Sequence, residues 1–367
     1  MTATAERRLL LACLLGLGMA LGCGARTALS SGEPPRDAGA DAHEPAGGFP
    51  CLWSLGERVE LGRGERFAEL TGAVHPTRDL VAVMATRGEA ERVGTIVTLD
   101  LRPERLVLFA GLRGEIFTGA SAWLRQDGEA CALVEHDDEF AEVARAAFGP
   151  RGARCAMSQT NGGRVEAVPL GPDGGLAFSM VYPGPVIEGV APVAGTEAAV
   201  MVRDPDRGAL FVLEDGGAAR IVRVRADDGA IDEVPLGRAS LASAVLDRVS
   251  NRALILYFDD GWRLVRAPWD GPLELAPHAD VRSMRRPIGR MRATDSEALV
   301  PLSDGTVAIF PLPASPVRFT EPVEPGRMVE AMEIVLRPGE SAGGLLYAHR
   351  EPSGEAVLVF RALVCNR

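Results

Sequence analysis

The residues whose types could do metal or acid–base chemistry fall in short acidic groups between apolar runs. The groups are "HDDE" at 136–139, Asp204 with Asp206, Asp259 with Asp260, and Asp304. Carboxylates on short loops suit calcium, but none of these groups has the DxDxDG spacing with a distal Glu. All fall within expected hairpins, where turn geometry alone favours Asp. We therefore expect no metal site, and we expect these turns to make one face of the protein acidic.

The other residues with catalytic or ligand potential form no recognisable motif. The five histidines are His43, His75, His136, His278 and His349, and they have no HxH, HExxH or CxxC partner. There is no GxSxG elbow, and the absence of lysine excludes Schiff-base and GxxxxGK phosphate-loop chemistry. No cofactor is therefore predicted. Trp53, Trp123 and Trp262 could line a ligand groove, although an aromatic side chain in a strand more often packs in the core.

Charge restricts the class of partner. The 367-residue chain has a net charge of −11, which argues against binding to nucleic acid or to an anionic membrane surface, because both need clustered cations. Its hydrophobic fraction of 47% is ample for a sizeable core. We expect the protein to be a monomer that meets the membrane through a lipid anchor only.

The N-terminus has the order of an export signal. Arg7 and Arg8 precede an apolar run from Leu9 to Gly22, which is too short to span a bilayer comfortably. The "ALGC" at 20–23 resembles the bacterial lipobox, and the resemblance implies that Cys23 is acylated and becomes the new N-terminus. An ordinary cleaved signal and a retained transmembrane helix are the alternatives.

Residues 24–48 read as a tether. They contain hardly any large apolar side chain and are rich in Pro, Gly, Ala and Asp, so they cannot bury enough surface to offset their ordering entropy. The sequence "GCGARTAL" followed by this stretch resembles the start of predicted myxobacterial lipoproteins. We expect a signal peptide at 1–22, a disordered tether at 23–48 and a folded domain at 49–367. The resemblance implies export and a lipid anchor in the bacterial envelope, at the outer membrane or the periplasmic face.

The folded region repeats one pattern, a pair of apolar strands joined by a tight polar turn. Five copies cover 79–101, 197–215, 251–269, 297–312 and 343–363, and a degraded copy begins at 129. They start at intervals of about 50 residues, a period typical of propeller blades. The segment 137–149 between copies has apolar residues spaced as in a short amphipathic helix, with Phe140, Val143 and Phe148 on one face.

A strand can be placed before and after each hairpin, which predicts an all-β propeller of six four-stranded blades. Seven blades are the alternative, because residues 216–237 are longer than one outer strand needs. The last unit has three strands of its own, and "ERVELG" at 57–62 can supply the fourth. The phrase "VHPTRDLVAV" around His75 weakly resembles the turns of TolB and YncE propeller repeats, and "PWDG" at 268–271 contains one Trp-Asp pair of the WD40 kind.

The cysteines follow from this geometry. The N-terminal strand would bring Cys51 to the same sheet end as Cys365, so we predict a disulfide that joins the two ends of the ring. Elimination then pairs Cys131 with Cys155, although simple hairpin register does not set them opposite each other. Two free thiols, and the other connectivities that four cysteines allow, stay open.

Two functions from different classes fit these observations. The first is a non-catalytic module that binds a protein or glycan partner at the cell envelope. The second is a secreted glycan hydrolase or lyase whose residues converge on the channel from separate blades, since propellers host both. Carboxylates within hydrogen-bond reach of Arg or His at the channel mouth would favour the enzyme. A channel plugged by apolar side chains, beside a broad apolar or aromatic patch on one face, would favour the binding module.

Overall fold

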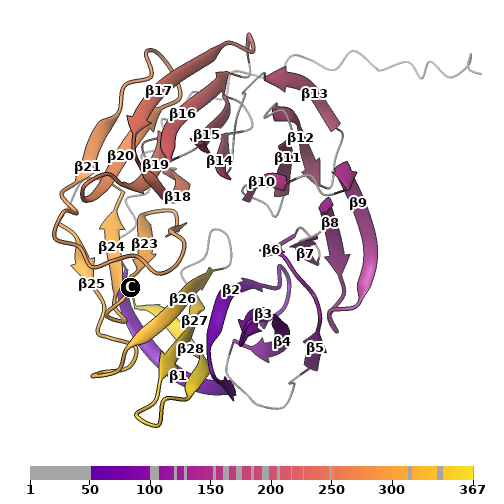
Figure 1. Ribbon diagram of the computed structural model, residues 1–367, viewed down its shortest axis with the longest axis vertical. Coiled ribbons are helices and arrows are strands. Elements are labelled where there is room, and N and C mark those ends of the chain that lie inside the picture. Colours follow the sequence, from indigo (N-terminus) through magenta and orange to yellow (C-terminus); the bar gives the residue numbers. More distant parts are fainter. Residues whose placement is uncertain are drawn as a thin grey trace, which may run out of the picture. The chain divides into compact units, whose positions relative to one another are not determined.

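The structure is a computed structural model that describes part of the chain (Figure 1). The chain divides into two units, Met1–Ala46 and Gly47–Arg367, and the described residues all belong to the second. They run from 51 to 366 except for 100–106, 120–121, 128–129, 152–153, 160–164, 171–175, 183–185, 192–197, 205–206, 216, 226, 248–249, 251, 313–315 and 337–341. At 107–110, 130–131, 148–199, 203, 215, 240–242 and 342, only the backbone of the described residues is given.

Every element among the described residues is a β-strand, and the strands form seven four-stranded antiparallel sheets. Blade 1 contains β2 (Phe67–Val74), β3 (Leu80–Arg87), β4 (Glu91–Thr98) and β5 (Val107–Ala110). Blade 2 contains β6 (Ile116–Thr118), β7 (Trp123–Gln126), β8 (Ala130–His136) and β9 (Glu142–Arg151). Blade 3 contains β10 (Arg154–Gln159), β11 (Val165–Leu170), β12 (Leu176–Tyr182) and β13 (Val186–Ala191).

The remaining blades follow the same order. Blade 4 contains β14 (Ala198–Asp204), β15 (Gly208–Asp215), β16 (Ala218–Arg225) and β17 (Ile231–Gly237). Blade 5 contains β18 (Ser240–Asp247), β19 (Arg252–Phe258), β20 (Trp262–Pro268) and β21 (Ala276–Ala279). Blade 6 contains β22 (Arg292–Ala293), β23 (Glu297–Pro301), β24 (Val307–Pro311) and β25 (Arg318–Phe319). Blade 7 contains β26 (Val329–Leu336), β27 (Ala342–Arg350), β28 (Ala356–Asn366) and β1 (Leu52–Gly64).

The blades are arranged as a β-propeller, with the first strand of each blade toward the centre of the ring (Figure 1). From blade 1 to blade 7 the first strands begin at a mean spacing of about 44 residues, which is close to the period of WD40-type blades. The expected four-stranded propeller is thus confirmed, and the ring has the seven blades that the alternative allowed. No described helix is long and apolar enough to cross a membrane.

The ring closes as expected, with the N-terminal strand as the outer strand of the last blade. Strand β1 pairs antiparallel with β28 from Leu52↔Asn366 to Gly64↔Ala356. The chain therefore enters the domain in blade 7 before it builds blade 1, and the two ends of the domain share one sheet (Figure 1).

The core lies between neighbouring blades. The central strands are continuous apolar runs because both of their faces are covered, as in β19, where Ala253–Tyr257 are all buried. One cluster joins Val81 and Val83 of blade 1 to Leu346 and Phe360 of blade 7. Burial of these runs against the next blade is what stabilises each four-stranded sheet.

The antiparallel order gives the propeller two faces with different connections. One face carries the turns from first to second and from third to fourth strand, and it includes Cys365 at the end of β28 and Cys51 before β1. We call this the clasp face. The other, the distal face, carries the turns from second to third strand and the loops that lead into each first strand.

Two expectations about local structure were wrong. Residues 142–151 form strand β9 and not a helix, because Phe140 is buried in the turn while Val143 is 58% exposed, so they do not share an apolar face. The acidic turns also do not share one face. Asp137 and Asp204 lie in clasp-face turns, whereas Asp259, Asp260 and Asp304 lie in distal-face turns.

Candidate functional site

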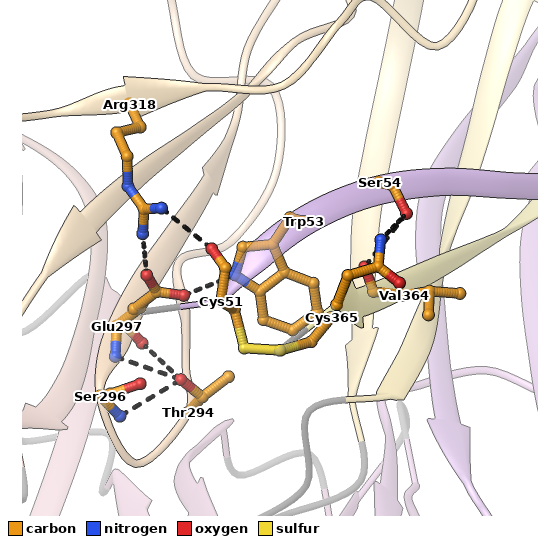
Figure 2. Close-up of a disulfide and its surroundings, with 10 residues drawn as sticks. Cys51, Trp53, Ser54, Thr294, Ser296, Glu297, Arg318, Val364 and Cys365 are labelled. Atoms are coloured by element: carbon orange, nitrogen blue, oxygen red, sulfur yellow. Dashed lines mark hydrogen bonds and ion pairs between the residues drawn. A yellow bond between two sulfur atoms is a disulfide. The ribbon is translucent and has the colours of Figure 1, made fainter. Parts of the chain in front are cut away.

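The two terminal cysteines form a disulfide at the clasp face (Figure 2). The sulfur atoms of Cys51 and Cys365 are 1.98 Å apart and the Cα atoms 5.1 Å apart, which are ordinary disulfide dimensions. The register that brings them together is the Trp53↔Cys365 pair of β1 and β28. The predicted link between the ends of the ring is therefore present.

The clasp is also held to blade 6 by a buried ion pair (Figure 2). The fully buried carboxylate of Glu297 accepts hydrogen bonds from the indole Nε1 of Trp53, at 2.5 Å, and from Arg318. The guanidinium of Arg318 also donates to the carbonyl oxygen of Cys51, at 2.9 Å. Burial raises the pKa of Glu297, although Trp53 and Arg318 act in the opposite direction. Trp53 thus has a structural role and does not line a ligand groove.

The remaining predicted cysteine positions cannot be compared with the structure. Cys23 and the side chains of Cys131 and Cys155 lie outside the described residues. The backbone places Cys131 on β8 of blade 2 and Cys155 on β10 of the neighbouring blade 3. Their pairing stays a prediction.

Two of the histidines join blades or turns. His75 is buried between blades 1 and 2, where its Nδ1 accepts from the backbone N–H of Thr77 at 3.3 Å, and its Nε2 lies 3.3 Å from Asp138. Its ring meets the edge of Trp123, whose indole is fully buried and donates to the carbonyl of Ala73. These contacts are those of a structural junction.

Both ring nitrogens of His136 are also engaged within the protein. Its ring stacks on Phe140 at 4.2 Å, and its two nitrogens lie 2.9 Å from the Phe140 carbonyl and 3.1 Å from Arg125 Nε. Burial lowers the pKa of His136, so the neutral ring donates to the carbonyl and accepts from the guanidinium. Neither nitrogen is free for a ligand.

The acidic turns use their carboxylates to hold their own backbone. Asp137 accepts from the backbone N–H groups of Glu139 and Ala141, and Asp304 accepts from the N–H and hydroxyl of Thr306. Within the part of the chain that the structure describes, no group of three or more His, Cys, Asp or Glu residues could hold a metal ion.

A charged cluster that the sequence did not indicate lies on the inner strands. Glu115, directly before β6, forms an ion pair with Arg290 and lies 3.5 Å from Arg292 at the start of β22. Arg292 also pairs with Glu333 of β26, with its Nε 3.0 Å from the carboxylate. We call these four residues the channel cluster. They come from blades 2, 6 and 7, so the cluster connects blades that are not adjacent in the ring.

A side-chain hydroxyl group positions Glu115, and another positions Arg290 in the same way. The hydroxyl of Thr71 accepts from the backbone N–H of Ile116, at 3.0 Å, and fixes the residue after Glu115. The hydroxyl of Ser243 does the same for Met291, at 3.0 Å, directly after Arg290. Glu115 and Arg290 therefore hold equivalent places at the start of their blades, on the distal face.

The local backbone and charge fit this arrangement. A side chain at Gly289 would place its Cβ 1.8 Å from the carbonyl oxygen of Met332, so only glycine lets the segment before Arg290 approach β26. Burial acts to raise the pKa of Glu115, but Arg290 and Arg292 outweigh it and hold that pKa below its usual range. Glu115 is consequently ionised and paired at neutral pH.

A pocket on the distal face of blade 5 is the second candidate. It has a volume of about 520 Å³, within the usual range for small-ligand sites. Its wall includes Tyr257, Trp262, Arg263, His278, Asp280 and Arg282. These residues come from the end of β19, the start of β20, and β21 with the loop after it, so one tight hairpin and one outer strand position the site.

The aromatic part of this pocket is set by strand register. Phe258 and Trp262 are directly opposite each other on β19 and β20, and their rings pack edge to face at 5.2 Å. Phe258 is 41% exposed, whereas Tyr257 on the other side of the strand is 9% exposed. Of the three tryptophans considered from the sequence, Trp262 is the one that the described structure places in a pocket wall.

Comparison with known proteins supports the fold. No family model matches the chain, and no curated protein matches it. A catalytically inactive variant of virginiamycin B lyase from Staphylococcus aureus, crystallised with quinupristin, superposes with a TM-score of 0.54 at 10% identity, covering 84% of this chain and 99% of that one. The WD40 domain of Toxoplasma gondii coronin superposes with a TM-score of 0.57 at 11% identity, covering 86% of each chain. At these identities the likeness shows a β-propeller and carries no activity.

Proposed function

We propose that this protein is an exported, lipid-anchored β-propeller that binds a protein or glycan partner at the bacterial cell envelope and does not catalyse a reaction. The observation that carries the binding function is the pocket around Trp262, because it combines an aromatic wall with polar groups that have no partner among the described residues. Such a combination is typical of a recognition site. The anchor rests on the resemblance of "ALGC" to the lipobox, and Cys23 is the residue that would carry the acyl chains.

The channel cluster meets the condition that would favour an enzyme, since carboxylates lie beside arginines. Its electrostatics nevertheless favour a structural role. A general acid or base needs a pKa near the working pH, whereas the arginines hold the pKa of Glu115 below its usual range. Both carboxylates are already engaged by arginine, so a substrate would have to break these pairs. We therefore keep the lyase or hydrolase as the less favoured candidate.

The disulfide supports the exported location. A bond between Cys51 and Cys365 suits an oxidising compartment outside the cytoplasm.

One experiment tests binding and another tests the anchor. Full-length protein, purified in detergent, is used to capture partners from the native envelope, with the Trp262→Ala variant as the comparison. Capture of the same partner by both would refute the pocket as the binding site. The matched control is Arg252→Ala, which removes an exposed arginine at the other end of blade 5.

For the anchor, metabolic labelling with a fatty acid should label the wild-type protein and not Cys23→Ala. Labelling that persists in the variant would exclude acylation at that residue. The disulfide of the exported variant serves as the control, because it reports that the domain has still reached an oxidising compartment and folded.

A further inference from the structure

We infer that the pocket of blade 5 binds an acidic saccharide, that is, a chain of pyranose rings that carry carboxylate groups. This inference rests on the proposed binding function and specifies its ligand. Two features of the wall support it: an aromatic surface, and two arginines that have no ion-pair partner among the described residues.

The aromatic surface suits the apolar face of a sugar ring. Trp262 forms part of the wall, and Phe258 packs against it with its own ring 41% exposed. The C–H groups on one face of a pyranose form a flat apolar surface, which packs well on an indole ring. Phe258 lies opposite Trp262 on the neighbouring strand, next to the tight turn at 259–261, and its ring supports the indole from outside the pocket wall.

The two cations give the pocket its preference for a negative charge. Among the described residues, Arg263 and Arg282 form no ion pair and no side-chain hydrogen bond, whereas most other arginine side chains are engaged by a carboxylate or a carbonyl. Asp280, the one carboxylate in the wall, accepts from the backbone N–H of Arg282 at 3.1 Å. A guanidinium binds a carboxylate through two parallel hydrogen bonds, so a uronate fits these arginines better than a neutral sugar does.

His278 lies in the same wall but is turned into the protein. Its ring hydrogen-bonds the carbonyl of Pro311, and its Nδ1 is buried. Burial lowers the pKa of His278 and so favours the neutral ring. The charge preference of the pocket therefore rests on Arg263 and Arg282.

Other ligand classes use fewer of these features. A purely apolar ligand would leave the two arginines without a counter-charge, and an inorganic anion would not use the aromatic wall. Nucleic acid is disfavoured by the net charge of −11. An acidic saccharide is the class that engages the aromatic and cationic groups together.

The test is calorimetric titration of the full-length protein in detergent with oligogalacturonate, oligoglucuronate and oligomannuronate, each of three to four residues. The methyl esters of the same oligomers are the matched ligands, since esterification removes the charge and keeps the rings. We expect at least one acid form to bind, and its ester to bind about tenfold or more weakly.

Three variants locate the binding. Trp262→Ala and the double variant Arg263→Ala/Arg282→Ala should each weaken binding of the acid form by about tenfold or more. Arg252→Ala, the matched exposed arginine on the same blade, should leave affinity unchanged. Because Trp262 packs against Phe258, its variant is first checked for wild-type urea unfolding; the double arginine variant does not depend on this packing.

The outcomes separate the ligand class from the binding function. Equal affinity for acid and ester, lost in Trp262→Ala, would overturn the acidic class while leaving a binding pocket in place. Absence of binding by every acid and ester would overturn the saccharide inference. The proposed function would then still be judged by partner capture that depends on Trp262, and it fails only if that dependence is also absent.

Discussion

The disulfide between Cys51 and Cys365 gives the sharpest test of how the ring is held together. We consider the double variant Cys51→Ala/Cys365→Ala, in which alanine is chosen because Cys51 is buried and a serine hydroxyl would be left without a partner. The folded structure should survive the change, because β1 remains paired with β28 along its length and Arg318 still donates to the carbonyl of residue 51.

The expected loss of stability follows from the length of the closed loop. The cysteines are separated by 314 residues. In the chain-entropy model, releasing a loop of that length gives the unfolded chain about 5 to 6 kcal/mol of additional conformational freedom at 25 °C. Disulfides usually contribute about 2 to 4 kcal/mol. We therefore expect the double variant to lose about 4 to 5 kcal/mol of its free energy of unfolding, between the usual contribution and the value of the model.

The assay is equilibrium unfolding in urea, followed by tryptophan fluorescence. The free energy of unfolding of the double variant is compared with that of the wild type, both with and without a reducing agent. In the reductant, the wild type and the double variant should have the same free energy of unfolding. The difference between the double variant with and without reductant shows how much any other disulfide contributes.

Two results would refute this reasoning. A loss below about 1 kcal/mol would show that covalent closure does not constrain the unfolded chain as the model assumes. A variant that does not fold at all would show that the strand pairing and the Arg318 contact are insufficient to close the ring. Non-reducing peptide mapping that pairs either cysteine elsewhere would remove the premise.

The channel cluster makes two further predictions. Glu115→Gln should lower the free energy of unfolding by about 1 to 2 kcal/mol at pH 7, because it leaves Arg290, which is partly exposed, without its carboxylate. Since the folded-state pKa of Glu115 is depressed, its contribution is present above the unfolded pKa and is lost as the pH falls through the lower folded-state pKa. The free energy of unfolding of the variant should therefore fall less steeply at acidic pH than that of the wild type. Gly289→Ala should cost more than about 2 kcal/mol because its Cβ would meet the carbonyl of Met332, whereas Gly62→Ala, whose Cβ meets nothing within 4 Å, should change the free energy of unfolding little in the same assay.

The fold could be predicted from sequence because each hairpin is formed by consecutive residues, whose apolar runs and polar turn are visible together. The turn at 259–261 joins two apolar runs, and register then follows from Arg252↔Pro268 to Phe258↔Trp262 without information from elsewhere in the chain. The same locality explains the clasp, since the last blade visibly lacked one strand. The count of blades was harder, because it depends on which strand of a blade each hairpin represents.

One hairpin occupies a different place in its blade from the others. The pair at 197–215 forms the first and second strands of blade 4, whereas the other complete copies form second and third strands. A pattern of apolar runs does not distinguish these positions, because inner and middle strands are both covered on two faces. Residues 216–237, which contain the outer strands of blade 4, therefore looked like an extension of the hairpin before them. The strands of blade 3 had no clear hairpin pattern of their own.

The error at 137–149 has a specific physical cause. Phe140 has a positive φ of 62° in the turn between β8 and β9, and it reaches the core beside Trp123 by that turn conformation. An aromatic residue with a left-handed backbone is uncommon, so sequence periodicity assigned it to a helix face. The turn is stabilised by Asp137, whose carboxylate accepts two backbone N–H groups.

The candidate sites show the limit of sequence reasoning more clearly. Trp262 could be suggested because tryptophan often contacts ligands, but Arg263 and Arg282 are ordinary arginines among 39 basic residues. Their place in the pocket wall distinguishes them, and that place depends on tertiary contacts. Glu115 and Arg290 are 175 residues apart in the chain, and their pairing needs the ring to bring blades 2 and 6 to a common centre.

The different contents of the two faces follow from one property of the propeller. Because neighbouring strands run in opposite directions, the connections between strands fall into two sets, one on each face of the ring. The clasp face closes the ring with a disulfide, a buried carboxylate and a fully buried tryptophan junction, all of which are engaged within the protein. The distal face instead carries the pocket, whose Arg263 and Arg282 have no ion-pair partner among the described residues. The contacts that close the ring therefore lie on the opposite face from the pocket.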